Sequence, residues 1–248
     1  MPMVGVGTCD VPEKVMSSLF QYAVSLGDNY FDSAYRYGNE SFIGSCFERG
    51  DIKRNEIILG TKLSYSQQMS DDIHKAVDES LRNLKTDYID LYFIHSPKSN
   101  TYCADWNELQ SIRNKGKIRE LAVSNFGINH IEQLYRATGV YPVLNQIEIH
   151  VGCYPKAVIQ FCKSHNIEVQ ASCPLYRMYS KMTESEELIK LSLKYQKTIP
   201  QLSLRWLLQN DILSIPRTSS IEHMKENNEI FDFVIDKNDI EFMNNTII

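Results

Sequence analysis

Four side chains have the types and spacing to move a proton onto a carbonyl oxygen. Tyr37 is a poor acid at neutral pH, because the ordinary pKa of tyrosine is about 10. A lysine ammonium beside it would lower that pKa, and Lys62 closes a β-rich run later in the chain. Asp32 would hold the ammonium in place. His95, uncharged, would orient a carbonyl through a hydrogen bond, and Tyr37 would protonate its oxygen as a hydride reaches the carbon.

This chemistry needs a hydride, which no protein side chain supplies, so it implies a nicotinamide cofactor. Each of the four residues also has a structural interpretation. Asp32 could cap a helix or form an ion pair, and Lys62 could be a surface lysine at a strand end. His95 could be a structural histidine, and Tyr37 could be an aromatic residue that only lines a pocket. Convergence of all four on one place is what favours the catalytic interpretation.

The elements that must position these residues alternate along the chain. Apolar residues recur at helical spacing between short β-rich runs, as in the stripe Ile73, Val77, Leu81 and Leu84. Repeated strand–helix units indicate a parallel sheet with right-handed crossovers. The eight β-rich runs are 3–8, 30–34, 57–62, 89–95, 121–125, 143–148, 168–172 and 213–216.

Eight such units predict an α/β fold, a (β/α)8 TIM barrel of one domain over residues 1–248. An open doubly wound sheet is disfavoured, because the Gly-x-Gly-x-x-Gly fingerprint is absent after the first run. Active sites in barrels lie at the C-terminal ends of the strands. Lys62 and His95 end two consecutive runs, and Asp32 lies in the run before them, so we expect the three to meet there.

Composition narrows the class of protein. The 248 residues carry a net charge of −5, which does not indicate a basic nucleic-acid surface. No apolar run approaches the roughly 20 residues of a membrane span, and the first residues do not resemble a signal peptide. We expect a cytoplasmic monomer or weak dimer with six reduced cysteines. The six histidines show no metal-binding spacing, so no metal site is expected.

Several segments resemble the aldo-keto reductase superfamily over nearly the whole chain. Residues 31–40 are similar to its signature D-[ST]-A-x-x-Y-x-N-E, which places the aspartate at Asp32 and the proton-donating tyrosine at Tyr37. Residues 58–62 and 88–95 look like its lysine and histidine strands. Residues 116–126 look like its G-K-[IV]-R-x-[IL]-G-V-S-N-F stretch, and residues 145–148 match N-Q-x-E.

The resemblance implies NADPH as cofactor, with NADH as a further possibility, and a small carbonyl compound as substrate. It implies that Ser124, Asn125 and Gln146 hold the nicotinamide carboxamide. Residues 216–219 would bind the adenosine phosphate end, with a helix N-terminus behind them favouring anions. The other implied cofactor residues are Gly7, Thr8, Asp32, Ser172, Pro174, Leu175, Arg217, Thr218, His223, Glu226 and Asn227.

Three cofactor positions depart from the family pattern. Ser172 stands where an aromatic usually stacks on the nicotinamide, so the stack is lost or comes from Tyr176 or Tyr179. Arg217 replaces a lysine. His223 replaces an arginine, and a histidine is mostly uncharged at pH 7. We therefore expect a weaker preference for NADPH over NADH than is typical.

The substrate pocket also departs from the pattern. Cys9 and Ser96 occupy places where aromatics are common, and Tyr176 is a further pocket candidate. The N-terminal hairpin and the long C-terminal loop of the family are missing from this sequence. We expect an open pocket with few aromatic side chains, suited either to a large or unusual carbonyl compound or to many simple aldehydes.

Two other functions stay open at this point. A nicotinamide-sensing regulatory subunit would need only the cofactor half of the site, whereas this sequence also has the four residues for chemistry. A phosphate-binding barrel isomerase or lyase would need no hydride, and Asn125 and Gln146 would then resemble nicotinamide ligands by coincidence.

Overall fold

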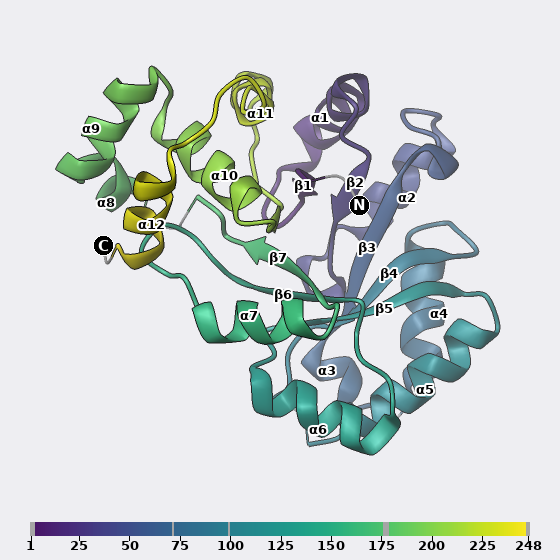
Figure 1. Cartoon of the computed structure of the whole chain (residues 1–248). Coiled ribbons are helices and arrows are strands. Elements are labelled where there is room, and N and C mark those ends of the chain that lie inside the picture. Colours follow the sequence, from purple (N-terminus) through teal and green to yellow (C-terminus); the bar gives the residue numbers. More distant parts are fainter. Residues whose placement is uncertain (1–2, 71, 99, 176–178, 247–248) are drawn as a thin grey trace.

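The computed structural model describes residues 3–70, 72–98, 100–175 and 179–246. Its eight strands form one parallel sheet in the order β1 to β8, with the helices outside the strands (Figure 1). The strands are β1 (Val6–Gly7), β2 (Tyr30–Asp32), β3 (Ile58–Leu63), β4 (Ile89–Ile94), β5 (Ile118–Ser124), β6 (Leu144–Glu148), β7 (Glu168–Ser172) and β8 (Leu213–Ser214).

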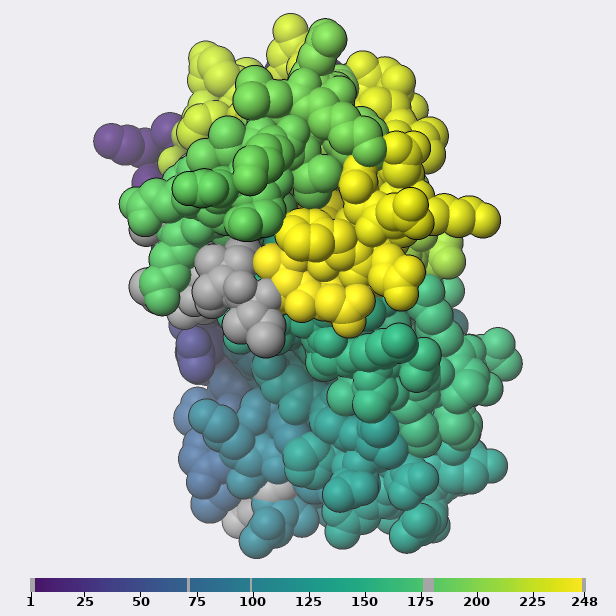
Figure 2. Space-filling model, turned by 60° about the vertical axis from the view of Figure 1, so that its left-hand side comes forward, coloured from purple at the N-terminus to yellow at the C-terminus, as the bar shows by residue number. Residues whose placement is uncertain are grey.

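The helices follow the strands in the predicted alternation, with extra helices after β3, β7 and β8. They are α1 (Glu13–Leu26), α2 (Glu40–Glu48), α3 (Tyr65–Gln68), α4 (Ile73–Asn83), α5 (Tyr102–Asn114), α6 (Ile128–Thr138), α7 (Lys156–Ser164), α8 (Tyr179–Glu184), α9 (Glu186–Tyr195), α10 (Ile199–Gln209), α11 (Ile221–Asn228) and α12 (Lys237–Asn245). Short 3-10 helices cover Tyr35–Tyr37 and Arg54–Glu56. Figure 2 shows α8 to α12, green to yellow, gathered on one part of the surface above the teal middle of the chain.

The sheet closes on itself where β8 meets β1. Parallel bridges join Val4 to Ser214 and Gly7 to Arg217, and the Gly7 amide donates to the Pro216 carbonyl at 3.2 Å. A side chain at Gly7 would place its Cβ 2.9 Å from the Ile215 oxygen, so glycine is needed for this close approach. The fold is therefore the predicted (β/α)8 barrel.

Among the eight strands only β7 has the predicted bounds, and the others are shifted, shortened or lengthened. β5 begins at Ile118, three residues before the predicted start at Leu121, because Ile118 pairs with Ile89 of β4. β8 ends at Ser214, short of the predicted Pro216. Proline has no backbone N–H to continue a strand ladder.

Two apolar clusters hold the barrel together. The larger one lies between the strands and the surrounding helices. The smaller one fills the inside, with Tyr30, Leu91 and Phe93 among its members. Gly60 of β3 makes room for two of these rings, since a Cβ there would lie 3.1 Å from the Tyr30 hydroxyl and 3.3 Å from Phe93. Residues that alternate along one strand thus face either the interior or the helices.

Two bulk features bear on the expected class of protein. Among the described residues, no helix is both long and apolar enough to cross a lipid bilayer. None of the six cysteines, all of which lie in the described part of the chain, forms a disulfide.

Candidate active site

Three adjacent strands bring the predicted catalytic residues to one end of the barrel. Asp32 is the last residue of β2, Lys62 lies near the end of β3, and His95 directly follows β4. The register pairs Asp32 with Gly60 and Lys62 with Phe93. Tyr37 ends the 3-10 helix that follows β2. These are C-terminal strand ends, where barrel active sites lie.

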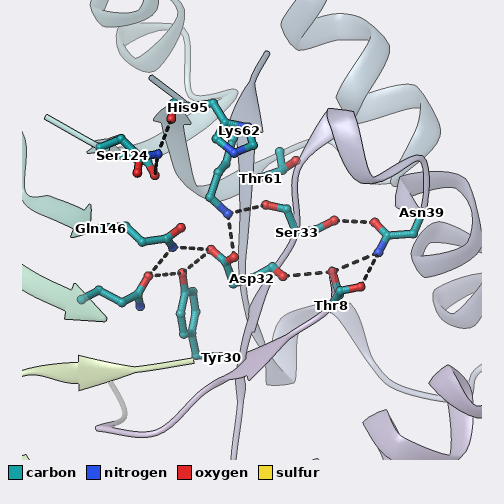
Figure 3. A network of polar contacts seen from close by, with 12 residues as sticks. Thr8, Tyr30, Asp32, Ser33, Asn39, Thr61, Lys62, His95, Ser124 and Gln146 are labelled. Carbon is teal, nitrogen blue, oxygen red and sulfur yellow. Dashed lines mark hydrogen bonds and ion pairs between the residues drawn. The ribbon is translucent and has the colours of Figure 1, made fainter. Parts of the chain in front are cut away.

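Lys62 and Asp32 form a buried ion pair. The Lys62 Nζ lies 2.6 Å from Asp32 Oδ2, and the two side chains are 0% and 2% exposed. The ammonium also donates to the carbonyl oxygen of Ser33 at 2.7 Å (Figure 3). Burial lowers the pKa of Lys62, and the charge of Asp32 opposes that shift. The predicted role of Asp32 as the holder of the ammonium agrees with this geometry.

The surroundings of Tyr37 correct one expectation. The Lys62 Nζ lies over the Tyr37 ring, 5.4 Å from its centre, yet the pKa of Tyr37 is raised rather than lowered. Burial is the largest cause, followed by the negative charge of Asp32 and by the Cys9 thiol. The expectation that Lys62 lowers the pKa of Tyr37 was wrong, because it left out desolvation and the negative charge of Asp32. The phenol is therefore protonated at neutral pH, which is the state that a proton donor needs.

His95 lies beside Tyr37 as an uncharged ring. The two ring centres are 6.0 Å apart with an interplanar angle of 86°. Burial lowers the pKa of His95 to about 3, and the positive charges of Lys62, Arg36 and Lys98 act in the same direction. The lowered pKa agrees with the predicted uncharged state of His95, and a neutral imidazole can donate one hydrogen bond to a carbonyl.

Beneath the ion pair, a buried polar network crosses the barrel interior (Figure 3). Gln146 of β6 donates to Asp32 Oδ1 at 2.9 Å and to Gln170 Oε1 at 2.6 Å. The Tyr30 hydroxyl lies 3.2 Å from Asp32 Oδ1 and 3.4 Å from Gln170 Oε1. Sequence reasoning missed Tyr30 and Gln170. Gln170 could have been found from the sequence, because it is a polar residue within a predicted strand. In the structure it pairs with Gln146 of the neighbouring strand.

A second network holds the ends of β1 and β2 together (Figure 3). Thr8 donates to the backbone oxygen of Asp32 at 3.0 Å. The Asn39 amide donates to the Thr8 carbonyl and hydroxyl oxygens, both at 3.0 Å, and its oxygen accepts from the Ser33 hydroxyl at 2.7 Å. Ser33 and Asn39 were not among the predicted site residues, although both lie within the signature segment.

Most of the predicted nicotinamide residues lie at the same end of the barrel. Ser124 ends β5 and is buried, whereas Asn125 is exposed and has a left-handed backbone with φ of 64°. The Asn125 amide donates to the His95 carbonyl and to the Ser124 hydroxyl, both at 3.0 Å. Half-buried Ser172 ends β7, and buried Pro174 and half-buried Leu175 follow it.

The predicted phosphate and adenine residues follow β8. Thr218 accepts from the Ser220 amide at 3.0 Å, and Ser220 caps the N-terminus of α11. His223 is exposed, Glu226 is half-buried and Asn227 is buried on this helix. The Arg217 guanidinium donates to the carbonyl oxygens of Cys9 at 3.0 Å and Asp10 at 2.5 Å. Arg217 is thus bonded to the loop after β1, an arrangement that the sequence did not predict.

The predicted substrate-pocket residues are described in part. Cys9 is half-buried, and its thiol lies 3.5 Å from an Asp10 carboxylate oxygen. Ser96 is half-buried and accepts from the Lys98 amide at 3.3 Å. Tyr176 lies outside the described residues, and the side chain of Tyr179 is not described either. The replacement for the missing nicotinamide-stacking aromatic therefore stays a prediction.

The barrel and its polar strand ends agree with one known family. The model of the Aldo/keto reductase family matches residues 5–247. The chain belongs to the aldo-keto reductase family. An aldo-keto reductase fold accounts for the strand order and for the site at the C-terminal strand ends. Because the family consists of oxidoreductases, the isomerase or lyase alternative is set aside.

Proteins similar to this aldo-keto reductase include two named reductases and one solved structure with NADP. Glyoxal reductase of Bacillus subtilis is 31% identical over 242 residues, which are 97% of this chain and 87% of that protein. Methylglyoxal reductase DkgA of Yersinia pestis is 31% identical over 245 residues, with the same two coverages. The structure of a Bombyx mori aldo-keto reductase in complex with NADP has a TM-score of 0.89 and 27% identity, and the match covers 98% of this chain and 88% of that one.

Proposed function

We propose that this protein reduces an aldehyde or a ketone to an alcohol with NADPH as hydride donor. The observation that carries the proposal is the meeting of a buried Lys62–Asp32 pair, a protonated Tyr37 and an uncharged His95 at the barrel mouth. A protein that only bound nicotinamide would need neither a proton donor nor a neutral hydrogen-bond donor beside it.

Each residue has one step in the proposed reaction. Bound NADPH supplies a hydride to the carbonyl carbon. His95 donates a hydrogen bond to the carbonyl oxygen and orients it. Tyr37 transfers its phenolic proton to that oxygen. Lys62, held by Asp32, places a positive charge beside the phenolate that remains, which offsets the cost of forming an anion in a buried site.

The residues at the mouth fit a nicotinamide dinucleotide. Gln146 has both amide hydrogens engaged and keeps its oxygen for a ligand. Arg217 and the capped N-terminus of α11 provide positive charge for phosphate groups. Ser124 and Asn125 would hold the carboxamide with Gln146. The remaining cofactor contacts would come from Gly7, Thr8, Ser172, Pro174, Leu175, Thr218, His223, Glu226 and Asn227.

Small α-dicarbonyl compounds are the substrates to test first. The names of the relatives above refer to glyoxal and methylglyoxal. Cys9 and Ser96, the proposed pocket residues, have small side chains and are half-buried. A pocket lined by small side chains leaves room for compact carbonyl compounds and also for larger aldehydes such as 4-nitrobenzaldehyde.

The decisive experiment follows NADPH absorbance after mixing purified protein with methylglyoxal or 4-nitrobenzaldehyde. Tyr37→Phe should lower kcat at least about a hundredfold, the usual contribution of a general acid. Tyr35→Phe is the matched control, because its hydroxyl contacts Glu79, and it should keep wild-type activity. Tight NADPH binding without turnover would support a nicotinamide-sensing subunit instead. Absence of nicotinamide binding would rule out both functions.

A further inference from the structure

Four side chains form what we call the barrel floor network: Tyr30, Asp32, Gln146 and Gln170. Their exposed fractions are 0%, 2%, 3% and 0%, so water does not compete for their hydrogen bonds. They come from three strands, β2, β6 and β7, and Figure 3 shows Tyr30 and Gln146 beside Asp32 of the Lys62–Asp32 pair.

The network determines which way the Gln146 carboxamide faces. Its nitrogen carries two hydrogens, and these donate to Asp32 Oδ1 at 2.9 Å and to Gln170 Oε1 at 2.6 Å. A reversed carboxamide would direct its own oxygen at the Asp32 carboxylate and the Gln170 oxygen. Only Gln146 Oε1 is left to face a ligand, and in the described part of the chain it accepts no hydrogen bond.

Gln170 provides this orientation at a cost to its own hydrogen bonding. Its oxygen accepts from Gln146 and lies 3.4 Å from the Tyr30 hydroxyl. Its nitrogen is buried and has no partner among the described residues. An unpaired buried amide is unfavourable, so an apolar residue would suit the barrel interior better. The presence of Gln170 despite that cost suggests that this residue has a functional role.

We propose that Gln170, assisted by Tyr30, is a positioning residue that fixes Gln146 with its oxygen toward the cofactor. A nicotinamide carboxamide carries an NH2 group, which can donate to Gln146 Oε1. One of the two Gln146 bonds goes to Asp32 and the other to Gln170, so the cofactor contact and the ion pair share one support. This inference rests on the proposed function, because it concerns the nicotinamide half of NADPH.

The experiment compares two ligands on the full protein. NADPH carries the nicotinamide, whereas 2′,5′-ADP carries only the adenosine phosphate end. Gln170→Leu should raise the Kd for NADPH about tenfold, the equivalent of one hydrogen bond between neutral groups. The Kd for 2′,5′-ADP should not change. The melting temperature should change little, because removal of the unpaired Gln170 nitrogen offsets the cost of leaving one Gln146 hydrogen without its acceptor.

Two further variants keep the result interpretable. Gln68→Leu is the matched control, since Gln68 is 1% exposed, lies outside the network, and has both amide atoms without a partner among the described residues. It should leave both Kd values unchanged. Gln170→Met keeps the length of the side chain and replaces Gln170→Leu if that variant does not fold.

The outcomes separate the two proposals. Suppose first that the wild type binds NADPH more tightly than 2′,5′-ADP. The positioning role is then overturned if Gln170→Leu or Gln170→Met leaves the NADPH affinity unchanged, or if the variant weakens the binding of both ligands equally. If the wild type binds NADPH no more tightly than 2′,5′-ADP, the nicotinamide itself is not recognised and the proposed function fails first.

Discussion

Lys62 and Asp32 form an ion pair at 2.6 Å in which both side chains are almost completely shielded from water. A buried pair of this kind is expensive to break one side at a time, because the remaining charge has no solvent to stabilise it. It also ties β2 to β3 at the point where the proposed chemistry takes place.

We expect Asp32→Asn alone to destabilise the protein by about 3–5 kcal/mol, since Lys62 would then be buried without its counter-ion. The double variant Asp32→Asn with Lys62→Met should recover most of this loss but none of the activity. Urea unfolding of both variants measures the effect. Lys75→Met, which breaks an exposed pair with Asp72, is the control and should leave the unfolding curve almost unchanged. A double variant as unstable as the single one would contradict this account.

The pKa of His95 predicts an acid sensitivity with a definite sign. The pKa of His95 is about 3 in the folded protein against an ordinary 6.5. Below pH 6.5 the unfolded chain binds a proton that the folded protein does not, so stability that is complete above pH 6.5 falls toward pH 3. Unfolding curves measured at several pH values should show that the free energy of unfolding of His95→Asn falls less with decreasing pH than that of the wild type. His74→Asn, a control variant outside the site, should lose stability at low pH as the wild type does.

The same shifts predict how activity depends on pH. His95 stays uncharged and Tyr37 stays protonated over a wide range, because burial opposes both ionisations. In the direction of carbonyl reduction, kcat/KM should therefore show no loss from His95 protonation between pH 5 and pH 7, below its ordinary pKa of about 6.5. A steep fall below pH 6.5 in the wild type would show that His95 titrates normally.

Arg217 and His223 should set the choice between NADPH and NADH. The Arg217 guanidinium already donates to the carbonyl oxygens of Cys9 and Asp10, so binding a 2′-phosphate competes with these bonds. We expect a modest NADPH preference in the wild type and a roughly tenfold higher one in His223→Arg, through one added charge-assisted hydrogen bond. The ratio of kcat/KM for the two cofactors measures this. A strong NADPH preference in the wild type would contradict the expected weak binding of the 2′-phosphate by Arg217 and His223.

The eight strands and the placement of Asp32, Lys62 and His95 could be predicted from the sequence because both depend on local patterns. Short β-rich runs between amphipathic helices indicate the repeated unit, and the strand ends of such units meet at one end of a parallel barrel. The signature around Tyr37 is likewise contained in ten consecutive residues, 31–40.

Only the tertiary structure decided how these groups affect one another. The pKa of Tyr37 rises because the closed barrel removes water and brings Asp32 near. Gln170 reaches Gln146 only through the register of β6 with β7, and Arg217 reaches Cys9 across 208 residues of chain. Local sequence patterns carry no information on such distances or on desolvation, because both depend on how the whole barrel packs.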